Sequence, residues 1–136
     1  MIVLSREDFS VGETLSRIKR ENTGAVVSFV GVVRGEYNGK RLLRMEIEVY
    51  EDMARNELTH LREIALSKFD IQDAIIWHRY GTLFPGDNIV MIVVASAHRK
   101  PAFEAAQFII DEIKRIVPIW KKEFYEDGEI WVEGSR

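Results

Sequence analysis

The sequence predicts an α+β fold, a two-layer sandwich of three main helices and a mixed, mostly antiparallel sheet. Three observations favour this class. Residues 43–50 alternate apolar and polar side chains, which is typical of a half-buried strand. Residues 24–33 and 89–97 are apolar on both faces, as buried central strands are. Three further segments have helical patterns and no linker interrupts the chain, so residues 1–136 are expected to form one domain.

The first part of the chain is expected to form a strand, a helix and a second strand. Residues 2–4 are a short apolar strand. Ser10 and Glu13 have the spacing of a capping box, which predicts a helix that ends near Lys19. The apolar residues 24–33 then form the second strand.

A polar loop separates residues 24–33 from the alternating residues 43–50. Asn38 and Gly39 within this loop are a turn signal. We therefore expect the two strands to pair as a hairpin with a long polar tip. Residues 51–68 carry their apolar side chains on one stripe and are expected to be helical.

The second half of the chain is expected to contain four strands, at residues 74–79, 89–97, 124–126 and 129–132. Residues 84–87 form the turn between the first two, and Asp127-Gly128 joins the last two as a hairpin. Pro101 lies in the first turn of a long helix that ends at Val117, because Pro118 blocks its continuation.

The chain contains no cysteine, which excludes several chemistries. It can form no disulfide, and it has no thiolate to act as a nucleophile or to hold an iron–sulfur cluster or a zinc ion. His60 and His78 have no second ligand at metal-binding spacing, so both are interpreted as structural. We expect no metal and no resident cofactor, and any sulfur must be brought by another molecule.

Charge and hydropathy exclude two classes of partner. The net charge is −3, from 19 basic and 22 acidic residues, whereas a general nucleic-acid binder usually carries a basic excess. An anion site must therefore be a local concentration of basic side chains. The longest apolar run, residues 89–97, is too short to span a bilayer, and the N-terminus lacks the pattern of a signal peptide. We expect a cytoplasmic protein with no nucleic-acid or membrane partner.

His98, Arg99 and Lys100 are three consecutive basic residues where the long C-terminal helix begins. A helix N-terminus carries about half a positive charge, so cations there are repelled unless an anion lies between them. A bound phosphate or carboxylate, held also by the free N–H groups of the first turn, explains the arrangement. The alternative is that the three side chains simply extend into water.

Lys114 lies at the border of the apolar stripe of this helix on a helical wheel. The stripe consists of Phe103, Ala106, Ile110, Ile113 and Val117. A lysine at such a border is partly desolvated, which makes it a candidate acid, base or nucleophile. The alternative is a snorkelling lysine whose stem covers the core. Phe108 lies on the opposite face and is either an interface residue or a single exposed aromatic.

Two more groups of basic residues are candidates for the same site. They are Lys121 and Lys122, next to Trp120, and Arg34, Lys40 and Arg41, around the loop after residues 24–33. Their alternatives are a solvated loop anchored by the tryptophan and an exposed hairpin tip.

Six strings extend over nearly the whole chain in a fixed order: FVGVVR (29–34), EVYEDMA (48–54), HRYGTLFPGD (78–87), SAHRKPAFEAAQFIIDEIK (96–114), VPIWKKE (117–123) and DGEIWVE (127–133). Each is weak alone. Together, with compatible spacing, they closely resemble the catalytic large subunit of molybdopterin synthase.

The resemblance implies a hammerhead-type two-layer fold and a central homodimer with one small carrier subunit at each end, a heterotetramer. The carrier is ubiquitin-like, and its C-terminal Gly-Gly ends in a thiocarboxylate. The implied activity is that of a sulfurtransferase of molybdenum cofactor biosynthesis. It adds two sulfurs to cyclic pyranopterin monophosphate, a pterin phosphate, to make the dithiolene of molybdopterin. The absence of cysteine agrees, because the sulfur arrives on the partner.

The resemblance also assigns site residues. The matching substrate-binding positions are Arg34, His98, Arg99, Lys114, Lys121 and Lys122, with Phe29 and Glu123 as pocket neighbours and the backbone of Val32 and Val33 along the same site. Lys114 and Lys121 are the catalytic candidates. The family often lends an arginine from the neighbouring subunit's C-terminal segment, and Arg136 is displaced by one position from that place. Arg136 is therefore a candidate contribution from the second subunit.

As a hypothesis, Arg34, His98 and Arg99 hold the cyclic phosphate. Lys114 then stabilises the negative charge that develops as the acyl–sulfur bond is made and broken, and Lys121 acts as general acid or base. The division of roles between the two lysines stays open.

Three rival functions come from other classes. A non-catalytic module that binds the ubiquitin-like carrier needs the Phe108 face or the Trp120 region but not Lys114. An RNA-binding domain uses residues 34–41 and loses affinity steeply with salt. A Schiff-base enzyme is trapped by borohydride on Lys114. None of the three accounts for all six strings.

Overall fold

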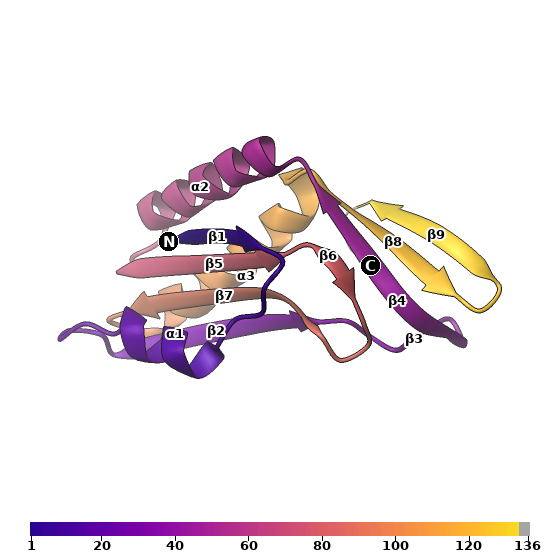
Figure 1. Cartoon of the computed structure of the whole chain (residues 1–136). Coiled ribbons are helices and arrows are strands. Elements are labelled where there is room, and N and C mark those ends of the chain that lie inside the picture. The colour runs from indigo at the N-terminus through magenta and orange to yellow at the C-terminus, as the bar shows by residue number, and fades with distance from the viewer. Residues whose placement is uncertain (134–136) are drawn as a thin grey trace.

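Within residues 1–133, which this computed structural model describes, the chain forms three helices and nine strands. The helices are α1 (Val11–Ile18), α2 (Glu51–Lys68) and α3 (Arg99–Ile116), and none of them is long and apolar enough to cross a membrane. The strands are β1 (Ile2–Ser5), β2 (Ala25–Val32), β3 (Glu36–Tyr37), β4 (Lys40–Val49), β5 (Asp73–Arg79), β6 (Gly81–Leu83), β7 (Asn88–Ser96), β8 (Ile119–Tyr125) and β9 (Gly128–Glu133). In Figure 1, α2 lies above one sheet and α3 behind it, and a second sheet extends beyond the end of the first.

The first sheet has the strand order β1-β5-β7-β2. β1 and β5 run parallel, whereas β5 and β2 both pair with β7 in the antiparallel sense. β7 is therefore hydrogen-bonded along both edges, and every residue from Ile89 to Ser96 is buried. The unbroken apolar sequence of this strand permits such a position, because neither of its faces carries a side chain that needs water.

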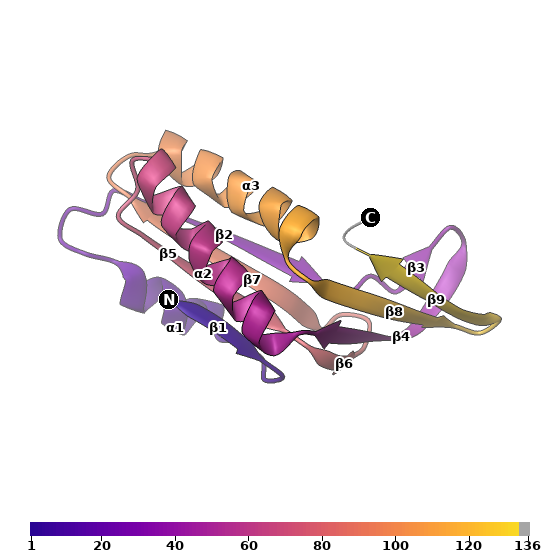
Figure 2. The same ribbon diagram turned by 90° about the horizontal axis from the view of Figure 1, so that it is seen from above.

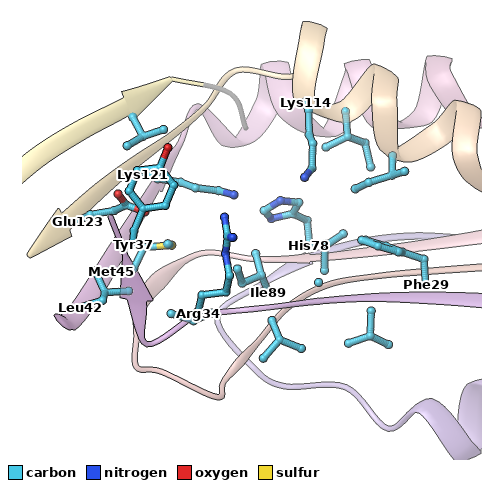
Figure 3. Close-up of a pocket in the computed structure, with 18 of the residues that line it drawn as sticks. Phe29, Arg34, Tyr37, Leu42, Met45, His78, Ile89, Lys114, Lys121 and Glu123 are labelled. Carbon is cyan, nitrogen blue, oxygen red and sulfur yellow. The ribbon is translucent and has the colours of Figure 1, made fainter. Parts of the chain in front are cut away.

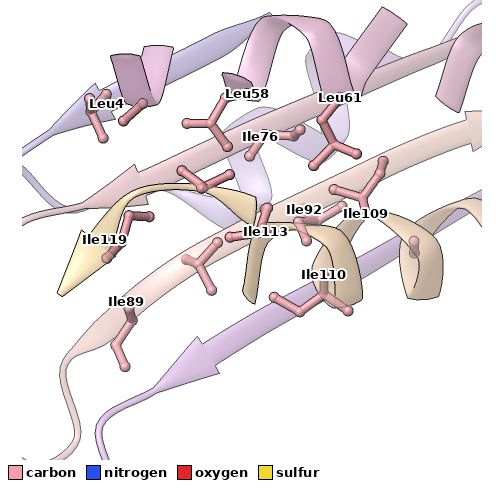
Figure 4. Packing of buried hydrophobic residues seen from close by; sticks show 14 of the residues in the cluster. Leu4, Leu58, Leu61, Ile76, Ile89, Ile92, Ile109, Ile110, Ile113 and Ile119 are labelled. Atoms are coloured by element: carbon pink, nitrogen blue, oxygen red, sulfur yellow. The ribbon is translucent and has the colours of Figure 1, made fainter. Parts of the chain in front are cut away.

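Helices α2 and α3 lie side by side over one face of the first sheet (Figure 2). Leu58 and Leu61 of α2 and Ile109 of α3 meet Ile76 and Ile92 of the sheet, and all five side chains are almost completely buried (Figure 4). Burial of one such side chain contributes roughly 1.5–3 kcal/mol to folding. This layer is the main hydrophobic core.

Helix α1 covers the opposite face of the first sheet. The Ser10 side-chain oxygen accepts a hydrogen bond of 3.2 Å from the backbone N–H of Glu13, which confirms the predicted helix start. Phe9 and Ile18 then pack with Met91 of β7 in a second, smaller cluster. The central strand is thus covered on both faces.

The second sheet has the order β3-β4-β8-β9, and β6 pairs with β4. The chain passes from the first sheet to the second between β5 and β6, at Gly81. The φ angle of Gly81 is +95°, a conformation that glycine adopts without the steric cost of a Cβ atom. A Cβ atom at this position would also lie 2.9 Å from a guanidinium nitrogen of Arg6. This turn brings the end of β5 close to the second sheet.

The predicted hairpin between residues 24–33 and 43–50 is wrong. β2 pairs with β7, whereas β4 pairs with β8 and β6, so the two segments lie in different sheets. Asn38 and Gly39 do form a tight turn, with φ angles of 51° and 75°, but this turn joins the short β3 to the start of β4. The central, buried position predicted for residues 24–33 is wrong as well, because β2 is the edge strand of the first sheet and none of its residues is fully buried. The one-sided β4 pairs with the partly exposed β8.

Three features of α3 and β8 also differ from the prediction. β8 begins at Ile119, so Trp120 to Lys122 lie in a strand and not in a loop. On α3, Phe103 is 62% exposed instead of buried. Phe108 packs on Phe69 behind α2, with ring centroids 5.4 Å apart, and is not a free interface residue. A helical wheel cannot show that a second helix covers the far side of α3.

The central core predicts a clear contrast between two truncations. Ile92→Ala removes a fully buried side chain from β7 and is expected to lower the free energy of unfolding by about 2–5 kcal/mol. Met53→Ala, on the exposed side of α2, is expected to change it by less than about 0.5 kcal/mol. Urea denaturation of both variants measures the difference, and equal losses would contradict the described core.

Candidate active site

A pocket of about 440 Å³ lies where the first sheet meets the second (Figure 3). Its walls come from the ends of β2 and β5, the start of β7, the last turns of α3 and the inner face of β4 and β8. The lining includes Phe29, Val32, Val33, Arg34, Tyr37, Leu42, Met45, His78, Ile89, Ile110, Lys114, Lys121, Glu123 and Tyr125. The volume lies within the range of small-molecule sites, roughly 300–1,000 Å³.

Lys114 and Lys121 reach into the pocket from different elements and point toward one another (Figure 3). Lys114 belongs to the last turn of α3, and Lys121 follows in β8, which begins at Ile119 just after the helix ends. Lys114 is exposed at the open side of the pocket, so the partial burial predicted for it is wrong. Of the two lysines, Lys121 is the one that is partly buried. Burial lowers the pKa of Lys121, the charge of Lys114 lowers it further, and Glu123 acts in the opposite direction.

Lys122 lies outside the pocket, although the resemblance assigned it to substrate binding. Neighbouring residues of a strand point to opposite faces, so Lys121 and Glu123 face inward and Lys122 faces outward. The Lys122 ammonium lies 3.2 Å from a carboxylate oxygen of Glu129 and 5.2 Å from the ring centroid of Trp131. Its contacts therefore connect β8 to β9.

The end of β2 supplies the opposite wall of the pocket. Phe29, Val32 and Val33 line it, and Arg34 follows with its guanidinium directed toward the lysines (Figure 3). The Val33 N–H donates to the Asp87 carbonyl at 2.9 Å, and the Val33 carbonyl accepts from Gly86 N–H at 2.9 Å. Both backbone groups of Val33 are thus engaged within the chain, so this residue contributes its side chain and not a free N–H.

His98 and Arg99 lie far from this pocket in the same chain. They stand at the exposed N-terminal end of α3, whereas Lys114 is near its C-terminal end. Fifteen residues of α-helix separate Arg99 from Lys114, a rise of about 22 Å. The His98 side chain makes no capping hydrogen bond. One chain therefore does not bring these two residues together with Arg34 and the lysines.

His78 is a pocket residue that sequence reasoning missed. It is 3% exposed and lies at the end of β5, between Lys114 and the wall that carries Arg34 (Figure 3). Burial lowers its pKa to about 4, with a further contribution from the charge of Lys121. The sequence could have indicated its burial, because side chains alternate between the two faces of a strand and His78 lies on the same face of β5 as the apolar Ala74 and Ile76.

No group of three or more histidine, cysteine, aspartate or glutamate side chains within residues 1–133 is arranged to hold a metal ion. The cations of the pocket instead suit an anionic organic ligand. Arg136, the candidate contribution from a second subunit, lies outside the described residues.

Comparison with known proteins places the chain in a family. A family model described as MoaE protein matches residues 4–116. The chain belongs to the MoaE family. The molybdopterin synthase catalytic subunit of Pyrococcus abyssi is 42% identical to this MoaE chain over 135 residues, which are 99% of this chain and 91% of the relative. The catalytic subunit of Bacillus subtilis is 40% identical, over 95% of this chain and 82% of the relative.

Solved structures of MoaE relatives agree with the fold. Molybdopterin synthase from Staphylococcus aureus superposes with a TM-score of 0.88 at 38% identity, over 96% of this chain and 94% of the other. A complex of subunits 1 and 2 of molybdopterin-converting factor from Helicobacter pylori has a TM-score of 0.75 at 24% identity, over 97% and 88%, and shows the fold alone. These findings confirm the predicted α+β class and the resemblance to the catalytic subunit of molybdopterin synthase.

The buried histidine of this MoaE chain predicts a pH-dependent stability. The pKa of His78 is lower in the folded chain than in the unfolded one, so the unfolded chain binds the extra proton between pH 6.5 and about 4. The stabilisation is full above pH 6.5 and falls by about 3 kcal/mol as the pH drops through this window. Urea denaturation of wild type and His78→Asn, at pH 7 and near pH 4.5, measures it. An equal loss in both proteins would show that His78 does not titrate in this way.

Proposed function

We propose that this chain is the catalytic subunit of a molybdopterin synthase, a sulfurtransferase of molybdenum cofactor biosynthesis. It converts cyclic pyranopterin monophosphate to the dithiolene of molybdopterin. A small carrier subunit delivers both sulfurs as the thiocarboxylate of its C-terminal Gly-Gly. The observation that carries the proposal is the pair Lys114 and Lys121, which face each other across one pocket. The similarity to the molybdopterin synthase catalytic subunits of Pyrococcus abyssi and Bacillus subtilis supports it.

The two sides of the pocket fit the two parts of this substrate. Phe29 and Ile89 give an apolar wall that suits a flat heterocycle. Arg34, Lys114 and Lys121 give a basic wall that suits a phosphate. The net charge of the whole chain is negative, so this local excess of cations steers an anion to the pocket and not to the surface in general.

Sulfur transfer needs positive charge where negative charge develops, and a group that moves a proton. Lys114 stands at the open side, where the carrier tail enters, and stabilises the charge on the acyl–sulfur group. Lys121, whose pKa burial lowers, gives or takes a proton as sulfur adds and the cyclic phosphate opens. Glu123 acts on this pKa in the opposite direction.

The proposed enzyme is a homodimer with a carrier at each end. The separation of His98 and Arg99 from Lys114 supports a second copy, because one chain cannot bring both ends of α3 to one small substrate. A second copy whose α3 N-terminus lies at this pocket supplies both residues, and Arg136 is a further candidate from that copy. The Helicobacter pylori relative was solved as a complex of two subunits, which supports a carrier partner. We assign the assembly to the cytoplasm and treat residues 1–136 as one domain.

Lys122 has a supporting role in this proposal. Its ion pair with Glu129 and its position over Trp131 connect β9 to the back of the strand that carries Lys121. Because these contacts are on the far side of the sheet, Lys122 acts on the pocket wall and not on the substrate.

Two adjacent lysines of β8 give a matched test of the catalytic pair. Lys121→Ala and Lys114→Ala are each expected to fold normally and to reduce product formation by about 10²–10³. Lys122→Ala removes the same charge from the opposite face and is expected to stay within about fivefold of wild type. The assay mixes each variant with thiocarboxylated carrier and cyclic pyranopterin monophosphate and follows the dithiolene product. Near-full turnover by Lys121→Ala would remove its proposed role.

The shared pocket predicts recovery of activity between two inactive variants. Arg99→Ala and Lys121→Ala each damage every pocket of their own homodimer. A mixed dimer has one pocket with both residues intact, so unfolding and co-refolding an equal mixture is expected to restore about a quarter of wild-type turnover. Each variant refolded alone is the control. If the mixture stays as inactive as its parts, Arg99 does not act on the pocket of a second copy.

A further inference from the structure

The pocket contains an imidazole that the proposed mechanism does not use. His78 sits on the sheet face that β5 shares with the fully buried Ala74 and Ile76, yet it is a polar residue at the end of the strand and lines the pocket. It is 97% buried, so almost every atom of the ring is covered by the protein. A buried polar group in such a position costs stability unless it is hydrogen-bonded. The hydrogen bonding of its two ring nitrogens therefore shows which of them can accept a proton in the pocket.

The hydrogen bonding leaves one nitrogen of His78 directed at the pocket. Nδ1 lies 2.8 Å from the carbonyl oxygen of Arg79 and donates to it, since a carbonyl can only accept. The proton of the neutral ring is therefore on Nδ1, and Nε2 carries a lone pair. Within residues 1–133 Nε2 of His78 has no hydrogen-bond partner. Every side-chain nitrogen or oxygen that is fully covered by protein in that range does have a partner, so Nε2 is not fully covered. Nε2 is consequently the atom of this ring that opens on the cavity.

The charges around the pocket keep this lone pair available. The charged groups that line it are Arg34 after β2, Glu36 of β3, Lys114 of α3 and Lys121 and Glu123 of β8. Burial and the charge of Lys121 keep His78 neutral at neutral pH. The phosphate of a bound substrate would add negative charge and raise the pKa of His78 toward the working pH, where a general base is most effective.

We propose that His78 is the general base for the water that cleaves the acyl–sulfur link between carrier and substrate. This inference rests on the proposed function. Once the carrier's sulfur has bonded to the pterin side chain, the carrier's terminal glycine is held as a thioester. Water attacks the thioester carbonyl carbon while Nε2 of His78 accepts a water proton. The carbon–sulfur bond then breaks and the sulfur stays on the substrate as a thiolate, whose charge Lys114 and Lys121 oppose.

The remaining atoms of this step are accounted for by the water. Its oxygen becomes part of the carrier's new carboxylate, and its second proton leaves the carboxylic acid for solvent. The proton on Nε2 is released before the next cycle. The other groups are less suited to this task, because the Arg34 guanidinium stays protonated, Lys114 holds the charge of the acyl–sulfur group, and Lys121 serves the pterin side chain in the proposed mechanism. Glu123 accepts a hydrogen bond of 2.9 Å from the Tyr125 hydroxyl, and Glu36 is exposed.

The test uses the whole chain with thiocarboxylated carrier and cyclic pyranopterin monophosphate, quenched at successive times. His78→Asn places an amide N–H near the position of Nδ1–H, so the bond to the Arg79 carbonyl is kept while the base is removed. We expect the covalent carrier–pterin adduct to accumulate in intact-mass spectra and its decay to slow by about a hundredfold or more. His60→Asn, an exposed histidine of α2, is the matched control and is expected to behave as wild type.

Two results would overturn the role of His78. One is adduct decay at the wild-type rate in His78→Asn, and the other is loss of adduct formation in a folded His78→Asn, which would make the residue a shaping element only. Failure of the proposed function looks different, because wild type itself would then give neither adduct nor product. If His78→Asn does not fold, the pH dependence of the decay of a preformed adduct on the wild-type protein tests the role of His78 instead. We expect decay to slow by about tenfold per pH unit below the pKa of His78 in the adduct, and pH-independent decay would overturn the inference.

Discussion

The burial of β7 on both faces is the constraint on which the rest of the structure depends. An apolar strand of this kind needs a hydrogen-bonded neighbour on each edge and a covering layer on each face. β5 and β2 provide the edges, α2 and α3 cover one face, and α1 covers the other. At the beginning of the strand, Ile89 and Val90 belong to the main core cluster and also line the pocket, together with residues of the last turns of α3. The pocket therefore lies where the first sheet ends and the second sheet begins.

This position explains how the pocket can carry basic groups beside an apolar wall. A side chain that enters the pocket loses hydrating water and contacts apolar residues instead. This desolvation disfavours the charged form of the side chain. Lys121 and His78 respond in the same direction, with both pKa values lowered, although one side chain belongs to the second sheet and the other to the first. The charge of Lys121 lowers the pKa of His78 further, and the charge of Lys114 lowers that of Lys121. An anionic ligand would favour the protonated forms of both side chains. Ligand binding and protonation are therefore coupled in this pocket.

The sequence was sufficient for local structure and insufficient for pairing. The alternation of residues 43–50, the Ser10 cap and the two proline-bounded ends of the last helix follow from rules that act within a few residues, and the structure agrees with them closely. Which strands pair is decided by matching surfaces far apart in the chain, so the hairpin between residues 24–33 and 43–50 was wrong. Similarly, the wheel of α3 placed Phe103 inside, because one helix alone does not show that a second helix covers another side.

The candidate site likewise contains residues that the sequence identified and residues whose role only the strand pairing shows. The resemblance supplied Arg34, Lys114 and Lys121, and these line one pocket, but no local pattern separates Lys121 from Lys122 until the register of β8 against β4 and β9 is known. That register also decides the chemistry. A chain without cysteine has no sulfur nucleophile of its own, so its contribution reduces to charges and protons supplied by nitrogen and oxygen groups. Among the nitrogen groups that line the pocket within residues 1–133, the cationic side chains can stabilise an anion, whereas the neutral ring of His78 can accept a proton. A site that both holds a thiolate and hydrolyses a thioester needs both kinds of group, and the end of β5 is where this fold brings them together.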